Sequence, residues 1–378
     1  MFKIKVGTSI NPDILTCIKE SAESIKSLDN LKLGMLFTSR KVDSAKAIHG
    51  AREVLGSKPI IGAACSGIIT KDGLIDNDIF SGIYGISDDD LIVGLAANES
   101  SGEPREIGKK MARAAITNAG IKKVPTHFFM LCNAINEEEY LKGIEDVIGT
   151  VPFFGGKVEG NIICNDEIIK NGCAVAFFYS KVEFKNILSG EYNETSDVGV
   201  ITKIKDDRVL VNINWNPAVK EYAKWAGEEP IEFMGSEIAT KSILHPLGVK
   251  DPLGSVTRVM QPLICNNDYS ITMSNNLALG TAVIKLESSI DDIIKSHAVV
   301  LNKLNAKMKK EPTGYFLIES ADRIRALKDR KDEVADTIKK TIPNKEFMLV
   351  LTNGEYGSCD HSANTCSALS MSFTSFGE

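Results

Sequence analysis

The sequence lacks a long hydrophobic run. Polar residues interrupt every apolar stretch well short of the roughly 20 residues that span a bilayer. The start, MFKIKVGTSI, has no apolar segment of signal-peptide length. We therefore expect a protein that is neither inserted in a membrane nor secreted.

A surplus of basic charge is also missing. The chain has 44 Lys and Arg against 50 Asp and Glu, which gives a formal net charge of −6. General nucleic-acid binders need clustered cations to release counterions from phosphates. The one short basic run, KMKK at 307–310, is typical of a solvated helix end. The charge balance argues against nucleic acid as a partner.

Cysteine is present but not in the patterns that build disulfide scaffolds or zinc ribbons. Eight cysteines are spread along the chain without a CxxC pair. Cys132 and Cys173 lie inside or beside apolar runs, as buried free thiols commonly do. A reducing, cytoplasmic setting is the simplest expectation.

Known catalytic motifs are absent. The sequence contains no HExxH, no GxSxG, no Walker A lysine loop and no clean GxGxxG. Its five histidines stand at positions 49, 127, 245, 297 and 361, and no two have a recognisable ligand spacing. We therefore predict that the protein is not an enzyme.

Two weaker chemical readings remain open. Cys65 follows an expected strand, and a helix after it would lower the pKa of its thiol, so it is a candidate nucleophile, with His361 as the candidate base. Cys359–His361 together with Cys366 offers zinc-type ligands, but the spacing matches no standard finger. The alternative for both is a packed thiol and a capped polar loop, and we predict no metal site.

What the chain does contain is an ordinary globular composition, with 43% hydrophobic and 25% charged residues. One arrangement recurs three times: an apolar strand, a helix, a Pro or Gly break, a second apolar strand and a Gly-rich loop. The first strands of the copies are Leu33–Phe37, Phe128–Cys132 and Tyr315–Ile318; the loops are at 62–67, 155–160 and 353–357. The pattern indicates a repeated α/β unit, although coincidence is the alternative.

The middle of the chain has a different character. Short β-like runs punctuated by Gly, Asn and Asp favour antiparallel hairpins. The predicted strands are Ala174–Tyr179, Val182–Leu188, Val198–Ile204, Val209–Ile213, Ser255–Met260, Tyr269–Met273 and Ala282–Leu286, with helices at Ala218–Ala226 and Ile290–Lys307. We place a domain change in the polar stretch Glu191–Asp197. The predicted fold is α+β, with two sheet-containing halves, residues 1–195 and 196–378, and helices packed outside.

The Gly loops are the best local candidates for a ligand site. Glycine at a strand end lets the backbone approach a ligand, and exposed amides there can bind carboxylate or phosphate. Arg323 follows the third copy's first strand as Arg40 follows the first copy's, and an arginine there can hold a carboxylate with two hydrogen bonds. The loop candidates are Gly62, Cys65, Ser66, Gly67, Gly155, Gly156, Asn353, Gly354 and Glu355. Three tight turns without a ligand are the alternative for the loops, and a surface arginine is the alternative for Arg323.

Taken in order, these segments resemble the FIST family, a two-part sensory module. The N-terminal resemblance lies in IIGAACSG at 60–67 and FFGG at 153–156. The C-terminal resemblance lies in NPAVKEY at 216–222, PLG at 246–248, Thr257–Arg258, the strand before Arg323, LTNGE at 351–355 and HSANT at 361–365. One departure is that Lys157, Val158 and Glu159 stand where the family usually has small residues and an acid.

The resemblance implies an intracellular sensor that binds a small ligand, such as an amino acid, between its two halves. It adds Arg258 to the ligand-binding candidates. The output is expected through a separate signalling partner, such as a histidine kinase or a chemotaxis component. No cofactor is expected.

Three alternatives stay open. Some relatives look like haem-based nitric-oxide sensors, for which His245 is the candidate axial ligand. A thiol-dependent enzyme would use Cys65. A protein-binding scaffold would use Trp215 and Trp225, although core packing is the commoner fate of two tryptophans beside one helix.

Overall fold

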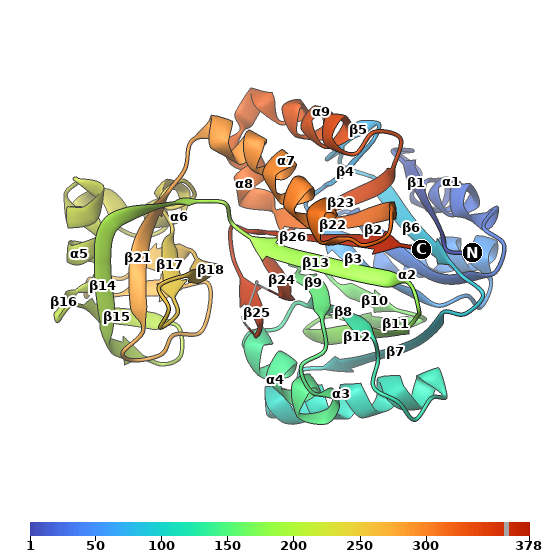
Figure 1. Cartoon of the computed structure of the whole chain (residues 1–378), viewed down its shortest axis with the longest axis horizontal. Coiled ribbons are helices and arrows are strands. Elements are labelled where there is room, and N and C mark those ends of the chain that lie inside the picture. Colours follow the sequence, from blue (N-terminus) through green and yellow to red (C-terminus); the bar gives the residue numbers. More distant parts are fainter. Residues whose placement is uncertain (359–362) are drawn as a thin grey trace.

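The chain folds into a body and a smaller lobe (Figure 1). The structure is a computed structural model, and it describes residues 1–358 and 363–378. The lobe, at the left of Figure 1, is formed by the elements between Asn193 and Glu287. Helices occur in both parts, with mixed sheets in the body and an antiparallel sheet in the lobe, which confirms the predicted α+β class. Among the helices of the described ranges, none has the length and apolar character needed to cross a membrane.

The body consists of three units that share one order of elements: strand, helix, strand, helix, strand, hairpin, strand. The first is β1 (Lys3–Ser9), α1 (Ile14–Lys26), β2 (Leu31–Ser39), α2 (Ser44–Leu55), β3 (Ile60–Cys65), β4 (Ile68–Thr70), β5 (Gly73–Ile75) and β6 (Ser81–Ser87). The second is β7 (Ile92–Glu99), α3 (Pro104–Ala119), β8 (His127–Cys132), α4 (Glu137–Ile148), β9 (Phe153–Lys157), β10 (Ile162–Cys164), β11 (Glu167–Ile169) and β12 (Gly172–Tyr179).

The third unit differs because the lobe is inserted after its first strand. It comprises β13 (Glu183–Ser189), α7 (Ile290–Lys307), β22 (Pro312–Ser320), α8 (Ala321–Ala326), η2 (Lys328–Arg330), α9 (Asp332–Thr341), β23 (Glu346–Thr352), β24 (Gly354–Ser358), β25 (Asn364–Ser367) and β26 (Met371–Gly377). The three-copy pattern in the sequence therefore corresponds to three structurally equivalent units.

Each unit builds four strands of a sheet and borrows a hairpin from another unit. The sheet orders are β1-β6-β2-β3-β10-β11, β7-β12-β8-β9-β24-β25 and β13-β26-β22-β23-β4-β5. The central pairs β2/β3, β8/β9 and β22/β23 are parallel. Because the hairpins are exchanged in a cycle, no unit completes its own sheet, and the three units form one cooperative body.

The centre of the body is a closed aromatic core between the three sheets. Phe316 of β22 packs against Phe37, Phe129 and Phe154, with ring centroids 5.7–5.8 Å apart. All four side chains are buried. The helices cover the outer faces of the sheets, as predicted, and bury their own apolar clusters there.

The lobe is a separate antiparallel sheet with its own core. It contains β14 (Asn193–Lys205), β15 (Val209–Ile213), β16 (Asn216–Pro217), α5 (Ala218–Ala226), η1 (Pro230–Phe233), α6 (Glu237–Lys241), β17 (Leu247–Lys250), β18 (Val256–Met260), β19 (Pro262–Cys265), β20 (Ile271–Met273) and β21 (Ala282–Glu287). The strands predicted for the middle region overlap β12, β13, β14, β15, β18, β20 and β21, and the two predicted helices coincide with α5 and α7. The predicted boundary at 195/196 falls within β14, and the two-half division stays a prediction.

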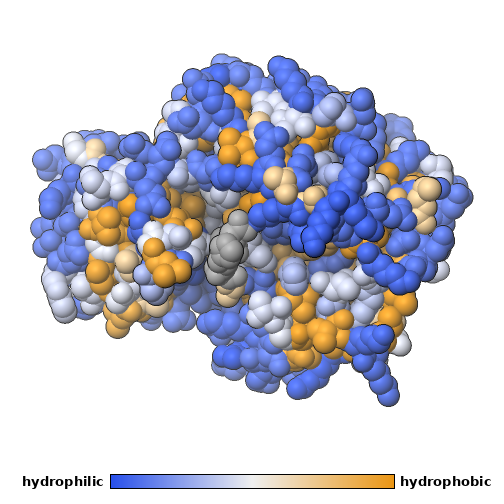
Figure 2. Space-filling model, in the orientation of Figure 1, coloured by the Kyte–Doolittle hydropathy of each residue, from blue (hydrophilic) through white to orange (hydrophobic). Residues whose placement is uncertain are grey.

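The two tryptophans of the lobe have different surroundings. Trp225 is 8% exposed and belongs to the lobe core, whereas Trp215 is 82% exposed. Figure 2 shows further apolar side chains gathered on the visible face of this lobe. Trp225 thus has the packing role that the sequence offered as the alternative to an interface.

Candidate ligand-binding cavity

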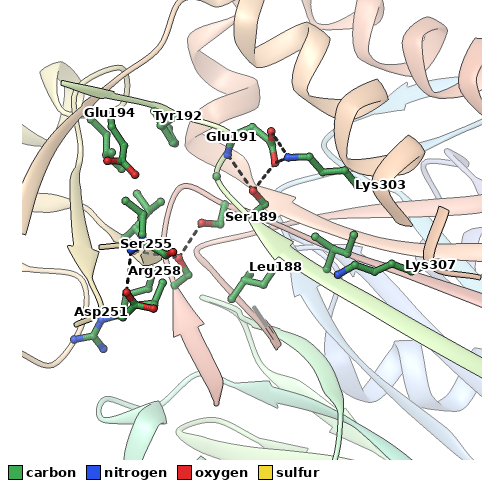
Figure 3. Close-up of a pocket in the computed structure, with 18 of the residues that line it drawn as sticks. Leu188, Ser189, Glu191, Tyr192, Glu194, Asp251, Ser255, Arg258, Lys303 and Lys307 are labelled. Atoms are coloured by element: carbon green, nitrogen blue, oxygen red, sulfur yellow. Dashed lines mark hydrogen bonds and ion pairs between the residues drawn. The ribbon is translucent and has the colours of Figure 1, made fainter. Parts of the chain in front are cut away.

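A cavity of about 760 Å³ lies at the junction of lobe and body (Figure 3). Its walls come from the end of β13 and the linker that follows, from β18 and the preceding turn, from the end of α7, and from the turn between β25 and β26. The lining includes Ser189–Tyr192, Glu194, Asp251, Ser255–Val259, Leu286, Lys303, Lys307, Ser367 and Ser370. Its volume falls in the range of roughly 300–1,000 Å³ that is usual for small-molecule sites.

Arg258, on β18, is the one predicted site residue that lines this cavity. Its Nη2 atom donates to the Asn276 carbonyl at 2.7 Å, and no carboxylate of the described chain lies within ion-pair distance of it. Burial lowers the pKa of Arg258, and the charge of nearby Glu138 only partly opposes this effect. A half-buried guanidinium without a carboxylate partner favours an anionic group on a ligand.

The hydroxyl groups at the cavity wall hold the junction together. Ser367 Oγ donates to the Val259 carbonyl at 3.1 Å and accepts from the Val259 amide at 3.0 Å, which ties the lobe to the body. Tyr192 Oη donates to the Ile243 carbonyl at 2.8 Å. The wall is therefore preformed rather than assembled by a ligand.

Acidic and basic groups both reach the rim. Glu191 pairs with Lys303 at 2.7 Å, and Glu194 pairs with Lys250 at 2.6 Å. Asp251 accepts hydrogen bonds from the turn that precedes β18. The rim carboxylates are thus already paired or hydrogen-bonded within the chain, whereas Arg258 has no carboxylate partner among the described residues.

An ionic clasp on the second unit also fixes the lobe. Arg208 Nη2 contacts Glu137 Oε2 at 2.8 Å and Glu138 Oε2 at 2.7 Å, and both glutamates are buried at the start of α4. Lys157 Nζ reaches Glu137 at 3.1 Å. Lys157, which departs from the family pattern, therefore neutralises Glu137 and does not line the junction cavity.

Arg323 lies behind the cavity wall instead of in it. Its guanidinium is fully buried, and its Nε donates to Glu319 Oε1 at 3.0 Å. The sequence offered a ligand carboxylate as its partner; the structure supplies a carboxylate from β22.

Glu355, on β24, is also buried behind the wall. Its carboxyl accepts from the Ser370 amide at 2.9 Å and from Thr352 Oγ1 at 3.0 Å. Burial raises the pKa of Glu355 well above its ordinary value despite these bonds. Burial thus opposes ionisation of this side chain.

The glycines of the first two loops are required by strand packing. A Cβ at Gly62 would lie 1.7 Å from the Leu36 carbonyl oxygen, and one at Gly155 would lie 1.9 Å from that of Met130. Gly156 and Gly354 occupy the paired strands β9 and β24, and Gly67 accepts from the Leu351 amide. The backbone that these glycines approach is that of a neighbouring strand, and their part in ligand binding stays a prediction.

The polar ends of the three loops do meet, at the surface of the body. Arg40 donates from Nη2 to Ser66 Oγ at 2.8 Å and pairs with Glu159. Asn353 Nδ2 donates to Glu159 Oε1 at 2.8 Å. Equivalent loops of all three units are thus joined by exposed, mutually satisfied groups, away from the junction cavity.

The thiol and haem alternatives find little support in the geometry. Cys65 is buried, and burial raises the pKa of its thiol to about 12, which opposes a thiolate nucleophile. His361 and the Cys359–His361 segment lie outside the described residues. His245 is exposed and lines neither the junction cavity nor the second cavity at α6 and α8, so it does not fit a haem pocket there. Within the described ranges no metal-binding group of side chains occurs.

The second cavity, of about 780 Å³, is lined mainly by apolar groups such as Ile243, Leu244 and Leu327. Its arginines are already neutralised within the described chain: Arg325 pairs with Asp322, and Arg330 with Glu333 and Asp291. None of the residues predicted to bind a ligand lines this cavity.

A three-unit α+β body with an inserted lobe and a preformed cavity at their junction defines a two-part architecture suited to ligand binding. Family comparison agrees with the resemblance in the sequence: the FIST N domain matches residues 32–216, and the FIST C domain matches residues 218–358. The chain belongs to the FIST family, whose domains are sensory domains of signalling proteins. No curated protein matches the sequence significantly.

Two solved structures share a similar outline. One is a chorismatase, with 8% identity and a TM-score of 0.38, covering 100% of this chain and 98% of that chain. The other is the cyanuric acid hydrolase of A. caulinodans, with 8% identity and a TM-score of 0.38, covering 99% of each chain. TM-scores of this size do not bear on function.

Several residues that line the junction cavity were not predicted from the sequence. Tyr192, Ser367, Ser370 and Lys303 form no motif, and they come from three separate parts of the chain. The signal in the sequence that could have indicated a cavity was the polar stretch after β13, which we interpret from the sequence as a domain change. A linker at a junction is also a common place for a ligand.

Proposed function

We propose that the protein is a sensor for a small molecule that carries a carboxylate, such as an amino acid, bound in the junction cavity. The observation that supports this proposal most is the half-buried Arg258, whose guanidinium lines the cavity without a carboxylate partner in the described chain. In this proposal Arg258 binds the ligand carboxylate, and an ammonium group on the ligand shares the rim acids Glu191 and Glu194 with their lysines. The role is binding and signalling in the cytoplasm, not catalysis.

Sensing follows from the position of the cavity. A ligand that contacts both β18 of the lobe and the linker of the body stabilises one arrangement of the two parts. A separate signalling protein, such as a histidine kinase or a chemotaxis component, would read that arrangement. The exposed Trp215 is a candidate contact for this partner.

A thermal-shift screen over the amino acids, dicarboxylates and nucleotides, with haem included, tests the proposal. A ligand at 100 times its dissociation constant adds about 2.7 kcal/mol to the free energy of unfolding. The proposal expects hits among the carboxylates. Stabilisation by haem with a Soret band, or by none of the compounds, would contradict it.

A further inference from the structure

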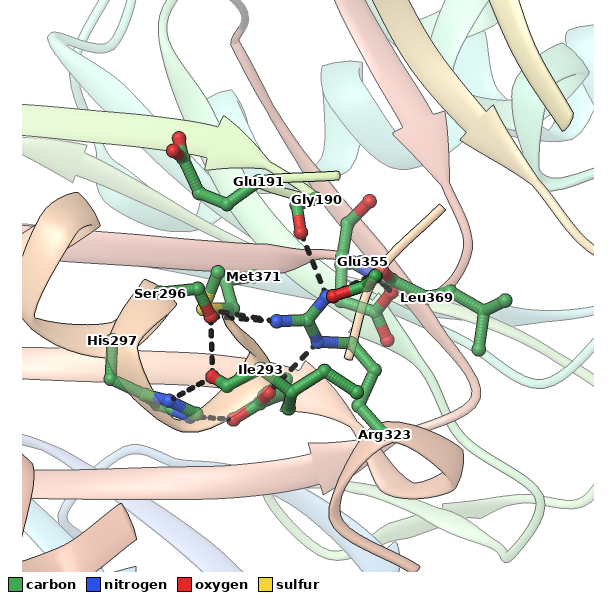
Figure 4. Close-up of polar contacts among 12 residues, drawn as sticks. Gly190, Glu191, Ile293, Ser296, His297, Arg323, Glu355, Leu369 and Met371 are labelled. Atoms are coloured by element: carbon green, nitrogen blue, oxygen red, sulfur yellow. Dashed lines mark hydrogen bonds and ion pairs between the residues drawn. The ribbon is translucent and has the colours of Figure 1, made fainter. Parts of the chain in front are cut away.

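Arg323 has contacts to three separate segments of the body (Figure 4). Its Nη1 donates to the Gly190 carbonyl at 2.8 Å and to the Leu369 carbonyl at 3.4 Å. Its Nη2 donates to Ser296 Oγ on α7 at 2.8 Å. One guanidinium thus contacts the linker at Gly190, the turn at Leu369 and helix α7.

Two of these segments border the junction cavity. Gly190 belongs to the linker that enters the lobe, and its neighbour Tyr192 covers the guanidinium at 5.3 Å. Leu369 belongs to the turn between Ser367 and Ser370, and its φ of 49° is in the left-handed region that costs energy for a leucine. Bonds from Arg323 help to hold both segments in place.

The third contact connects the cavity wall to a helix. α7 ends at the cavity, where Lys303 and Lys307 line it, and begins where the chain returns from the lobe. A second link to α7 runs through Glu319, whose Oε2 lies 2.6 Å from His297 Nε2. Burial alone would raise the pKa of Glu319, but the charges and hydrogen bonds of His297 and Arg323 lower it, so the carboxylate stays ionised between its two partners.

The geometry points to Arg323 as a positioning residue: it fixes the linker at Gly190 and the turn at Leu369, two borders of the junction cavity, relative to α7. Only the connection between this positioning role and ligand sensing rests on the proposed function. The positioning itself belongs to the unliganded protein. A ligand that displaces the linker would act on α7 through this side chain.

Only a planar, forked cation can serve the three directions at once. A lysine at this position keeps the charge but not the fixed arrangement of donors. A methionine keeps much of the length and removes every hydrogen bond. Arg325 gives a matched control, because it lies on the same short helix, is 64% exposed at its side chain and pairs only with Asp322 in the described chain.

Hydrogen–deuterium exchange of the unliganded full chain tests the assignment with R323M, R323K and the control R325M. In R323M, amides in peptides covering 188–193 and 367–371 should exchange about tenfold faster, because bonds to a buried charged group are lost. Peptides covering β2 and β8 should keep the wild-type rate, and R323K should resemble R323M more than the wild type.

A gentler variant guards against loss of folding. S296A removes the bond between Arg323 and α7 together with the Ser296 Oγ contacts to the Ile293 carbonyl and Met371 Sδ, and it leaves the Glu319–His297 link to α7 in place. It should speed exchange at 188–193 by about threefold. Uniformly faster exchange across the body in R323M, with no local effect in S296A, would assign Arg323 a purely structural role and overturn the proposal. Equal behaviour of R323M and R325M would do the same. Because no ligand is used, neither result depends on whether the cavity binds a carboxylate.

Discussion

The centre of the body and its junction with the lobe differ in the residues that meet there and in how far these residues fill the space. In the body, three equivalent units bring their Gly loops together, and the space between the sheets is filled by aromatic rings such as Phe316. At the junction, an insertion in one unit breaks the threefold pattern and leaves a polar cavity. The repeated features serve packing, whereas the unrepeated insertion leaves a cavity.

The largest expected effect is in the centre. Phe316→Ala removes a ring that contacts aromatic residues of two other strand pairs, and should lower the free energy of unfolding by about 3–5 kcal/mol. Chemical denaturation followed by circular dichroism measures this. A loss below about 1 kcal/mol would mean that neighbouring side chains fill the space left by the ring or that water already occupies the centre. Either result would contradict the contrast between a closely packed centre and a cavity at the junction.

An intermediate, pH-dependent effect is expected behind the cavity wall. Glu355 has an ordinary pKa of 4.5, and burial raises it well above that in the folded protein. As the pH rises above 4.5, the unfolded chain releases this proton before the folded chain does, so the group contributes less and less to stability.

Glu355→Gln removes this decrease of stability with rising pH while keeping the shape of the protonated side chain. Relative to the wild type, the variant should therefore gain about 1 kcal/mol or more in free energy of unfolding between pH 4 and pH 8. Parallel denaturation curves at both pH values give the difference. A relative gain on acidification would reverse the sign and show that Glu355 is ionised in the fold.

A smaller effect is expected from removing the cavity's free cation. Arg258→Met deletes one hydrogen bond, to Asn276, but also relieves the burial of an unpaired charge. The two changes oppose each other, and the free energy of unfolding of the unliganded protein should change by less than about 1 kcal/mol. A much larger loss in a thermal melt would identify Arg258 as a structural residue.

The smallest effect is expected where the three loops meet. Arg40→Ala breaks contacts to Ser66 and Glu159, but these groups are largely solvated. An exposed ion pair of this kind contributes about 0–1 kcal/mol. A loss above about 2 kcal/mol in the same denaturation assay would show that the loop ends matter to the body as much as its core does.

Much of the fold could be predicted from the sequence, because local patterns determined it. The bounds of α5 and α7 follow from helical periodicity and capping, and Gly120 ends α3 in the left-handed conformation that a C-cap glycine adopts. The three-copy pattern was visible for the same reason. The exchange of hairpins between units could not be predicted, because the pairing of strands that are distant in the sequence produces no local sequence pattern.

The candidate site was only partly predictable. Arg258 was found through a family motif, but its cavity depends on Tyr192, Ser367 and Lys303, which are distant from it in the chain. Arg323 is predicted from the sequence to bind a ligand carboxylate or to lie at the surface, and in the structure its buried guanidinium binds the carboxylate of Glu319 instead. The sequence does not reveal whether such a group points outward to a ligand or inward to the protein.

One titration tests the central claim that the ligand binds at the junction and not at the loops. The strongest carboxylate from the thermal-shift screen is titrated by calorimetry into the wild type, Arg258→Met and Asn353→Ala. The account predicts that Arg258→Met weakens binding about tenfold or more, since a charge-assisted hydrogen bond is lost, and that Asn353→Ala leaves the dissociation constant unchanged. Weak binding in Asn353→Ala with wild-type binding in Arg258→Met would contradict it.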